Sequence, residues 1–400
     1  MEQVYIIDGI RTPIGKLGGG FSNLRADDFA ALAIEELVKR NPSIPREAYD
    51  EVILGCHNQA GEDNRNIARM ALLLAGLPVT VTGETVNRLC SSGMAAIING
   101  KRTIQCNDAD LIIAGGVEHM TRAPWVLAKN EQAYSNSFQM ENSAFGWRFI
   151  NPKMTELYGT ESMGMTAENL VDKYSITRED QDEFAFRSQM KAAKAQQNGR
   201  FSEEIFKITY TYKGKKYSIE EDEFIKPNTS IDALKKLKPA FKINGTVTAG
   251  NSSGLNDGVA VCLLASQKAI ETYQLQPMAK IVASATTGVL PNIMGIGPVS
   301  AVQKVLEKAH LTLNDIDIIE INEAFAAQVL ACTRALGLAD DDPRINPNGG
   351  AIALGHPLAM SGARITYSAA LELQKTKKKY AIATLCVGVG QGYAVVLERV

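Results

Sequence analysis

The run Leu111-Ile112-Ile113-Ala114-Gly115-Gly116 sets four apolar residues directly against two glycines. A short, uninterrupted apolar run of this kind is typical of a strand that is buried on both faces by covering helices. The same arrangement returns late in the chain, where Tyr380-Ala381-Ile382-Ala383-Thr384-Leu385 leads into Cys386 and further glycines. The repeat indicates that one structural unit occurs twice.

Helices and strands are predicted in the same order around both runs. In the first part, we expect strands at 4–7, 52–54 and 111–116, and helices at 26–40, at 66–74 and after Cys90. In the second part, we expect strands at 279–283, 316–321 and 380–385, and helices at 300–309, 325–336 and 361–373. This order predicts an α/β fold made by internal duplication, with two halves whose mixed, parallel-rich sheets are covered by helices. In such folds, ligands bind beyond the carboxyl ends of the strands.

Residues 120–248 break the repeat, because they are polar, charged and rich in turn signals. A helix at 178–197 stands out there, with acidic residues in its first turns and lysines near its end, as suits the helix dipole. We therefore predict an N-terminal half at 1–119 and 249–270, an inserted loop domain at 120–248 over the active site, and a C-terminal half at 271–400.

The composition excludes several classes of function. With 400 residues, 22% of them charged, and a net charge of -2, the chain has no basic excess and is not expected to bind nucleic acid as its main partner. No apolar run reaches about 18 residues, so membrane insertion is not expected, and the first residues lack a signal-peptide pattern. The six cysteines are scattered without a CxxC pair. This spacing argues against a disulfide framework or a metal site and favours reduced thiols in the cytoplasm.

Cys90 is the first candidate for chemistry. It stands in Asn87-Arg88-Leu89-Cys90-Ser91-Ser92-Gly93, directly before a predicted helix. The free amides and the dipole at a helix N-terminus lower the pKa of a thiol, and a thiolate is a nucleophile. The alternative is a buried structural cysteine, which is a common fate of a single thiol.

His356 lies between Gly355 and Pro357, in a small-residue stretch ahead of another helix. A histidine there can accept a thiol proton; the alternative is a capping or surface histidine. Of the other three histidines, His57 and His119 follow strands and are secondary candidates, and His310 ends a helix and is expected to face water.

Three further stretches carry candidates. Cys386 is followed by alternating glycines, including Gly388, which suits a loop that offers backbone amides to an oxyanion and not a phosphate loop. Asn322 ends a strand, where it either caps the next helix or holds a catalytic water. The small, polar stretch 248–254 is either a turn into a further helix or a site of backbone approach to a pantetheine-like chain.

Together, the motifs around Cys90, Asn322, His356 and Cys386 resemble those of the thiolase family, the acetyl-CoA acyltransferases. The likeness extends over nearly the whole chain, from Asp8-Gly9-Ile10-Arg11-Thr12-Pro13 to Glu398-Arg399-Val400. The resemblance implies two alike α/β halves stacked in five layers, a loop domain, and assembly into a homodimer or homotetramer.

The resemblance also implies the roles of the site residues. Cys90 is similar to the nucleophile that accepts the acyl group, and His356 is similar to the group that activates it. Cys386 resembles the acid/base that moves a proton to or from the acetyl methyl carbon. His356, with a water held by Asn322, resembles one oxyanion hole, and the amides of Cys90 and Gly388 resemble the other.

For coenzyme A (CoA), the resemblance implies a second set of contacts. Ser253 matches the loop serine that contacts the CoA chain, with Ala249 nearby and Phe325 lining the pocket. Lys226 falls where some members have an arginine near the nucleotide. CoA and acyl-CoA thioesters are then substrates, and no metal or redox cofactor is expected.

The chain departs from the family pattern at two places and is similar to one branch at two others. Members often read Cys-Ile-Gly-Gly-Gly around the second cysteine, where this chain has Cys386-Val387-Gly388-Val389-Gly390. Ser162 stands where biosynthetic members often carry histidine. The stretches 145–152 and 339–344 look like the degradative 3-oxoadipyl-CoA branch, whose substrate has a distal carboxylate that Arg148 is expected to face.

Other functions remain open at this point. Within the family, the alternatives are a general fatty-acid 3-ketoacyl-CoA thiolase and an acetoacetyl-CoA thiolase. A decarboxylating ketoacyl synthase is disfavoured, because Cys386 takes the place of its second histidine. A non-catalytic acyl-CoA carrier is an alternative of another class, and it would tolerate loss of Cys90 or His356.

Overall fold

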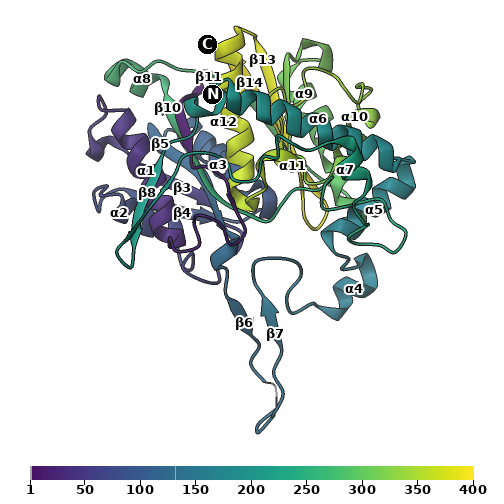
Figure 1. Cartoon of the computed structure of the whole chain (residues 1–400). Coiled ribbons are helices and arrows are strands. Elements are labelled where there is room, and N and C mark those ends of the chain that lie inside the picture. Colours follow the sequence, from purple (N-terminus) through teal and green to yellow (C-terminus); the bar gives the residue numbers. More distant parts are fainter. Residues whose placement is uncertain (1, 131) are drawn as a thin grey trace.

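The computed structural model describes residues 2–130 and 132–400 (Figure 1). Ten strands form one mixed sheet, ordered β12-β13-β14-β11-β1-β10-β5-β3-β4, with β2 beside β10. The strands are β1 (Val4–Arg11), β2 (Gly15–Lys16), β3 (Glu51–Gly55), β4 (Thr82–Val86), β5 (Leu111–His119), β10 (Asn256–Ser266), β11 (Ala279–Gly288), β12 (Ile318–Ile321), β13 (Tyr380–Val387) and β14 (Gln391–Arg399). The helices that accompany them are α1 (Ala26–Arg40), α2 (Ile67–Leu74), α3 (Ser92–Gln105), α8 (Gln267–Tyr273), α9 (Gly297–Ala309), α10 (Ala326–Ala335), α11 (Ala351–Leu354) and α12 (Leu358–Thr376).

The strand order displays the duplication. The first half runs β4-β3-β5-β10-β1, and the second runs β12-β13-β14-β11 in the same sense. Ile345 forms a parallel bridge with Ile319 of β12, so it occupies the place that β4 has beside β3. In both halves the last strand, β10 or β14, is antiparallel to both of its neighbours.

The prediction of two parallel-rich sheets is wrong in its details. Only β3 with β4, β3 with β5, and β12 with β13 are parallel pairs between named strands. The first strands of the two halves, β1 and β11, pair through Tyr5 with Lys280 and Ile6 with Ala279, which joins the halves into one sheet. Because the sequence pattern of a buried strand is the same in either direction, it did not reveal the antiparallel strands.

Three apolar cores divide the molecule into layers. The central core combines α3 and α12 with inward side chains from both halves of the sheet, such as Ile112 and Leu385. A second core packs α1 and α2 on the outer face of the first half, and a third packs α9 and α10 on the second half. Figure 1 shows α3 and α12 at the centre, between these outer helices. The order is therefore helix, sheet, helix, sheet, helix, as the resemblance implied.

We expected strand β5 to end at its glycines, at residue 116. The strand continues instead, and the glycines allow a helix to approach it closely. β5 continues to His119, and a Cβ on Gly116 would lie 2.1 Å from the carbonyl oxygen of Ala359 in α12. Two helices, α1 and α6 (Arg178–Gln197), have the predicted bounds. Within residues 2–130 and 132–400, no helix combines the length and the apolar character required to cross a membrane.

The segment between β5 and β10 contains the elements outside the repeat. They are β6 (Trp125–Leu127), β7 (Met140–Asn142), α4 (Pro152–Tyr158), α5 (Met163–Tyr174), α6, β8 (Ile208–Tyr212), β9 (Lys215–Ile219) and α7 (Ile231–Lys235). In Figure 1, β6 and β7 form an arm that projects away from the rest of the molecule. The predicted boundaries at 119, 249 and 270 stay predictions.

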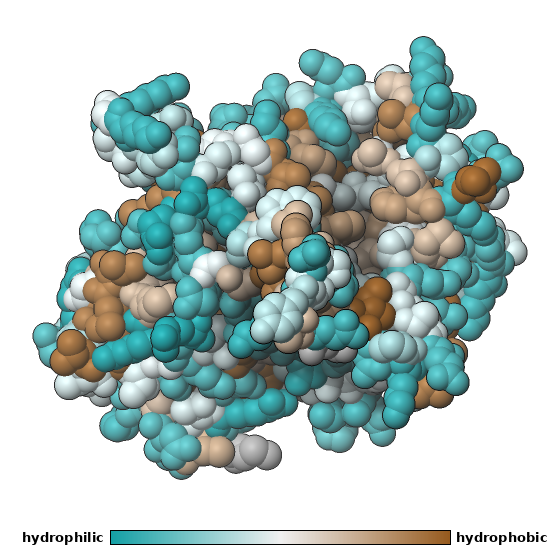
Figure 2. Space-filling model, turned by 90° about the horizontal axis from the view of Figure 1, so that it is seen from below, coloured by the Kyte–Doolittle hydropathy of each residue, from teal (hydrophilic) through white to brown (hydrophobic). Residues whose placement is uncertain are grey.

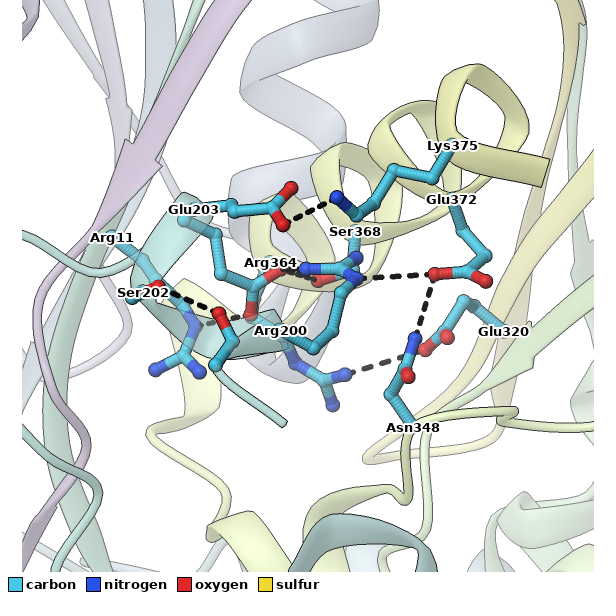
Figure 3. Close-up of polar contacts among 12 residues, drawn as sticks. Arg11, Arg200, Ser202, Glu203, Glu320, Asn348, Arg364, Ser368, Glu372 and Lys375 are labelled. Atoms are coloured by element: carbon cyan, nitrogen blue, oxygen red, sulfur yellow. Dashed lines mark hydrogen bonds and ion pairs between the residues drawn. The ribbon is translucent and has the colours of Figure 1, made fainter. Parts of the chain in front are cut away.

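A buried network of charges binds this segment to the core (Figure 3). Arg200, after α6, contacts Glu204 at 3.1 Å and Glu372 of α12 at 3.1 Å. Glu204 also accepts hydrogen bonds from Arg11 of β1, at 2.7 Å, and from Ser368 of α12, at 3.1 Å. Each buried charge therefore has an opposite partner, which buried ion pairs require in order not to destabilise the fold.

Candidate active site

Cys90, His356 and Cys386 line a single cavity of about 500 Å³, together with residues from both halves and from the inserted segment. Its wall also contains His57, Leu89, Phe145, Gly146, Trp147, Arg148, Met163, Phe241, Ser252, Ser253, Gly254, Leu255, Met294, Ala324, Phe325, Leu358, Gly388 and Val389. A cavity of about 580 Å³ between α1, α2 and β8 is larger, but no cysteine or histidine lines it. The chemistry that the sequence predicted therefore belongs to the smaller cavity.

The close crossing of α3 and α12 explains why two distant parts of the chain meet here. A Cβ on Gly93 would lie 2.5 Å from the Ala359 carbonyl oxygen, and one on Gly362 would lie 2.7 Å from the Met94 amide nitrogen. The two helices therefore touch backbone to backbone at their N-terminal ends. Cys90 precedes α3 and His356 precedes α12, so the duplication places both residues at the same end of the central layer.

Cys90 lies in a 3-10 turn, Leu89–Ser91, and is half-buried. Burial is the main reason that the pKa of its thiol is raised to about 11. The backbone amide of Gly388 bonds to the thiol and lowers this pKa, whereas the negative charge of Glu118 raises it. The expectation of a lowered pKa is therefore wrong for this structure. The apolar wall desolvates the thiolate more strongly than the helix N-terminus favours it.

His356 is buried and held by bonds on both sides of its ring. Its Nδ1 is 2.6 Å from Ser361 Oγ, and Ser361 Oγ donates its only hydrogen to the Pro357 carbonyl at 2.9 Å. With Ser361 Oγ donating to the Pro357 carbonyl and Asn322 Nδ2 donating to Nε2 at 3.3 Å, both contacts fit a ring whose hydrogen is on Nδ1 and whose lone pair is on Nε2. This is the tautomer that a proton acceptor at Nε2 requires.

Burial, with a smaller effect from Arg364, lowers the pKa of His356 to about 3. The imidazole is consequently neutral at physiological pH, and the thiol of Cys90 is protonated. A neutral thiol beside a neutral imidazole is therefore the resting state.

Asn322 lies directly after β12, and its Nδ2 is 3.3 Å from His356 Nε2. Its buried Oδ1 has no partner within the described residues. Phe325 and not Asn322 occupies the N-cap of α10, so the capping alternative is wrong. Asn322 does not line the cavity; it lies behind His356, and its unpartnered oxygen can accept a hydrogen bond from a polar ligand such as a water.

Cys386 lies near the end of β13, opposite Gly392 of β14, and is fully buried. Burial raises the pKa of its thiol well above the ordinary value, and the charge of Cys90 adds to this effect, as expected for two thiols in one cavity. The turn that follows is strained, because Val389 has a φ of 62°. Leu89, next to Cys90, has a φ of 48°, so both cysteine segments include a residue in the left-handed region. Such strain is concentrated at functional sites.

The predicted CoA contacts divide into two groups. Ser253 and Phe325 line the cavity, and their segments are joined by a bond from the Ser253 amide to the Ala324 carbonyl at 3.0 Å. Ala249 and Lys226 are exposed and lie outside the cavity wall; the Lys226 ammonium lies 4.9 Å from the centre of the Phe224 ring. The loop that contains Ser253 leads into strand β10 and not into a helix.

Three residues at the site were not predicted in their roles. Ser361 orients His356, as described above. Buried Glu118 accepts from the Ala359 amide at 3.1 Å and from the His57 amide at 3.3 Å, and it thereby fixes the start of α12 beside Cys90. Phe241 packs edge-to-face on Phe325, with ring centres 6.0 Å apart. For these three roles, the sequence offered one signal, which is the position of Ser361 five residues after the candidate histidine His356. His119 does not line the cavity; it is buried 3.3 Å from Asp257.

Comparison with known proteins agrees with this geometry. The family model "Thiolase, N-terminal domain" matches residues 4–268, and "Thiolase, C-terminal domain" matches residues 275–399. The chain belongs to the thiolase family. It is an acyl-CoA acetyltransferase, and the two matches cover the two repeats described above.

Individual relatives are similar over their full length. The chain is 54% identical to the 3-oxoadipyl-CoA/3-oxo-5,6-dehydrosuberyl-CoA thiolase of Escherichia coli K12, covering 100% of both chains. It is 53% identical to the beta-ketoadipyl-CoA thiolase of Pseudomonas aeruginosa, again over 100% of both. Among solved structures, the acetyl-CoA acetyltransferase of Bacillus anthracis has a TM-score of 0.93 at 42% identity, covering 100% of this chain and 99% of the other. Human mitochondrial 3-ketoacyl-CoA thiolase in complex with CoA has a TM-score of 0.92 at 38% identity, covering 100% and 98%.

Proposed function

We propose that this thiolase cleaves 3-oxoadipyl-CoA with CoA, giving acetyl-CoA and succinyl-CoA by way of an acyl group on Cys90. The observation that carries the proposal is a cavity containing two thiols and a neutral imidazole, in a chain 54% identical over its full length to a relative named for this substrate. The degradative direction agrees with the branch-like stretches 145–152 and 339–344.

In the first step, the sulfur of Cys90 bonds to the 3-oxo carbon, and its proton passes to Nε2 of His356. The bond between carbons 2 and 3 then breaks, and the electron pair remains on the acetyl-CoA carbanion. Cys386 protonates that carbanion and becomes a thiolate. Two buried thiols suit this sequence, because neither is ionised at rest and each carries the proton that it must give.

In the second step, free CoA attacks the thioester on Cys90. The proton of the CoA thiol returns to Cys386, and the bond from Cys90 to the acyl carbon breaks. His356 returns its proton to Cys90, so the enzyme ends as it began. No redox or metal chemistry is required by this balance, and CoA enters as a substrate.

Two groups of donors face the developing oxyanions in this scheme. Asn322 and His356 form one, with a water held at the asparagine, and the amides of Cys90 and Gly388 form the other. The bond of the Gly388 amide to the Cys90 thiol supports the second assignment, because it places that donor at the reacting sulfur. Each such donor is worth roughly 3 kcal/mol of barrier lowering.

Steady-state rates test the substrate directly. We expect kcat/KM for 3-oxoadipyl-CoA to exceed the values for acetoacetyl-CoA and for long, unbranched 3-oxoacyl-CoA substrates by about tenfold or more. A higher value for acetoacetyl-CoA or for the long chains would instead assign the protein to the other thiolase branches.

Assembly and location complete the proposal. We propose a homodimer or homotetramer in the cytoplasm. Seen from below (Figure 2), apolar residues gather beside the arm that projects toward the viewer. Trp125 and Leu127 of the arm are each 62% exposed, an unusual exposure for an isolated chain. Light scattering of a variant without residues 128–139, compared with the complete chain, tests whether the arm contributes to assembly.

A further inference from the structure

We propose that Arg148 binds the distal carboxylate of the acyl chain and thereby selects 3-oxo dicarboxylic acyl-CoA substrates. The inference rests on the proposed function, which names such a substrate. It adds the residue that distinguishes this substrate from a neutral chain of the same length.

The composition of the cavity wall is the first observation. Among the described residues of the wall, Arg148 is the one Arg, Lys, Asp or Glu. Most of the remaining wall is apolar or aromatic, including Phe145, Trp147 and Met294. A carboxylate placed in such surroundings without a partner would cost several kcal/mol. One cation in the wall is therefore enough to decide between a charged and a neutral chain end.

The second observation is that Arg148 has no carboxylate partner within residues 2–130 and 132–400. Other arginines of the inserted segment have carboxylate partners: Arg122 contacts Glu62, Arg178 contacts Asp182 and Arg187 contacts Glu183. Arg148 is half-buried, yet among residues 2–130 and 132–400 it has neither an ion-pair partner nor a side-chain hydrogen bond. A half-buried guanidinium with five free donors favours a planar carboxylate, which it can bind with two parallel bonds.

The third observation is that the segment around Arg148 is anchored. Trp147 Nε1 donates to the Glu161 carbonyl at 3.2 Å, and Asn151 caps α4 by accepting from the Lys153 amide at 2.9 Å. The carboxylate of Glu161 accepts from Asn169 at 2.6 Å, so it is already engaged. Arg148 is thus presented from a held segment, four consecutive residues of which, from Phe145 to Arg148, line the cavity.

The chemistry of the substrate fits this arrangement in both steps. In 3-oxoadipyl-CoA, the carboxylate lies three carbon–carbon bonds beyond the carbon that Cys90 attacks. That part of the chain stays on Cys90 as a succinyl group until CoA removes it. A cation in the cavity wall can therefore hold the chain during attack and during release, and its loss should lower kcat/KM and raise KM for the acidic substrate.

The test compares two substrates of equal chain length, 3-oxoadipyl-CoA and 3-oxohexanoyl-CoA, and uses the ratio of their kcat/KM values. For Arg148→Met, we expect the ratio to fall by roughly 10- to 100-fold, the value of a lost charge-assisted pair. Arg148→Lys keeps the charge but not the planar fork, and its ratio should lie between those of the other two proteins. Lys153→Met is the matched control, because it removes one positive charge from an exposed position outside the cavity wall, and its ratio should equal that of the unmodified enzyme.

The outcomes separate the two proposals. A ratio near one in the unmodified enzyme would contradict the proposed substrate itself. A strong preference in the unmodified enzyme that Arg148→Met retains within about threefold would overturn the role of Arg148 and leave the substrate intact. If Arg148→Met is inactive on both substrates, the ratio of kcat/KM values for Arg148→Lys provides the test. A ratio equal to that of the unmodified enzyme would exclude bidentate binding by the guanidinium, and an intermediate ratio would support it.

Discussion

At the scale of single residues, the site depends on proton positions that the surroundings of each group impose. Burial holds the Cys90 and Cys386 thiols protonated and the His356 ring neutral, and Ser361 fixes which ring nitrogen is free. At rest the cavity therefore contains two protonated thiols and one neutral imidazole.

Alkylation by iodoacetamide tests the state of Cys90. With a pKa of about 11, the rate of modification should still rise between about pH 8 and about pH 10, because the thiolate fraction keeps growing. Mass mapping of the peptide that contains Cys90 measures this rate apart from the exposed Cys106, and Cys90→Ala is the control. A plateau below about pH 9 would show that the site stabilises the thiolate at rest.

Replacing Ser361 tests the tautomer of His356. In Ser361→Ala, Nδ1 loses its acceptor, so we expect kcat/KM to fall roughly 10- to 100-fold, which corresponds to the cost of about 1–3 kcal/mol for a buried donor left without a partner. Ser361→Thr keeps the hydroxyl and should restore most of the activity. Equal activity in all three proteins would show that the bond at 2.6 Å does not orient the ring.

At the scale of elements, the β13–β14 turn carries strain beside the reacting sulfur. Val389 lines the cavity at a φ of 62°, a conformation that a β-branched residue adopts at a cost. The next residue, Gly390, has a φ of 84°, and a Cβ there would lie 2.2 Å from the Val289 carbonyl oxygen. The backbone of Gly390 is therefore packed closely against Val289, which leaves little room for the turn to change its conformation.

Val389→Gly should therefore stabilise the protein by about 1 kcal/mol, because glycine adopts this φ without strain. Val79→Gly is the matched control: Val79 is 77% exposed and has no positive φ, so the same change there should be neutral or destabilising. Urea denaturation midpoints provide the measurement. A lower midpoint for Val389→Gly than for the parent would mean that the side chain contributes more through packing than it costs in strain.

The elements also show what the sequence could predict. Helix α1 was predicted from its apolar stripe and α6 from its charge order, because these signals are local. The close approach of α12 to β5 at Gly116 joins segments more than 240 residues apart, and no local pattern records such a contact.

The site residues divide in the same way. The cysteines and His356 were found from small-residue motifs, which reflect the close crossing of α3 and α12. Ser361 and Glu118 act through hydrogen bonds that exist only after the two halves have met. The pKa of Cys90 was predicted in the wrong direction, because desolvation by the assembled wall has no counterpart in the sequence.

At the scale of the whole molecule, the network around Glu204 connects β1, the inserted segment and α12 (Figure 3). Burial alone would raise the pKa of Glu204, but Arg11 and Arg200 outweigh it and lower the pKa to about 2. A lowered pKa in the folded state contributes stability above the unfolded value of about 4.5, and this contribution is lost as pH falls toward 2.

We therefore expect the free energy of unfolding to decline between about pH 4.5 and pH 2, and Glu204→Gln to reduce that decline. At neutral pH the same variant should lose about 1–3 kcal/mol, because Arg11 and Arg200 each lose one of two carboxylate partners and keep only Asp222 and Glu372, respectively. Urea titrations at several pH values measure both effects. A Glu204→Gln protein with the stability and acid profile of the parent would show that the network does not bind the inserted segment to the core.

The central claim is that Cys90 holds the acyl group between the two steps, and intact mass spectrometry tests it most directly. The enzyme mixed with 3-oxoadipyl-CoA in the absence of free CoA should gain the mass of a succinyl group on the peptide that contains Cys90. Addition of CoA should remove it, and Cys90→Ala should never acquire it. Tight binding of the substrate without any adduct would indicate a carrier, and an adduct that persists in Cys90→Ala would place the nucleophile elsewhere; either result would contradict the account.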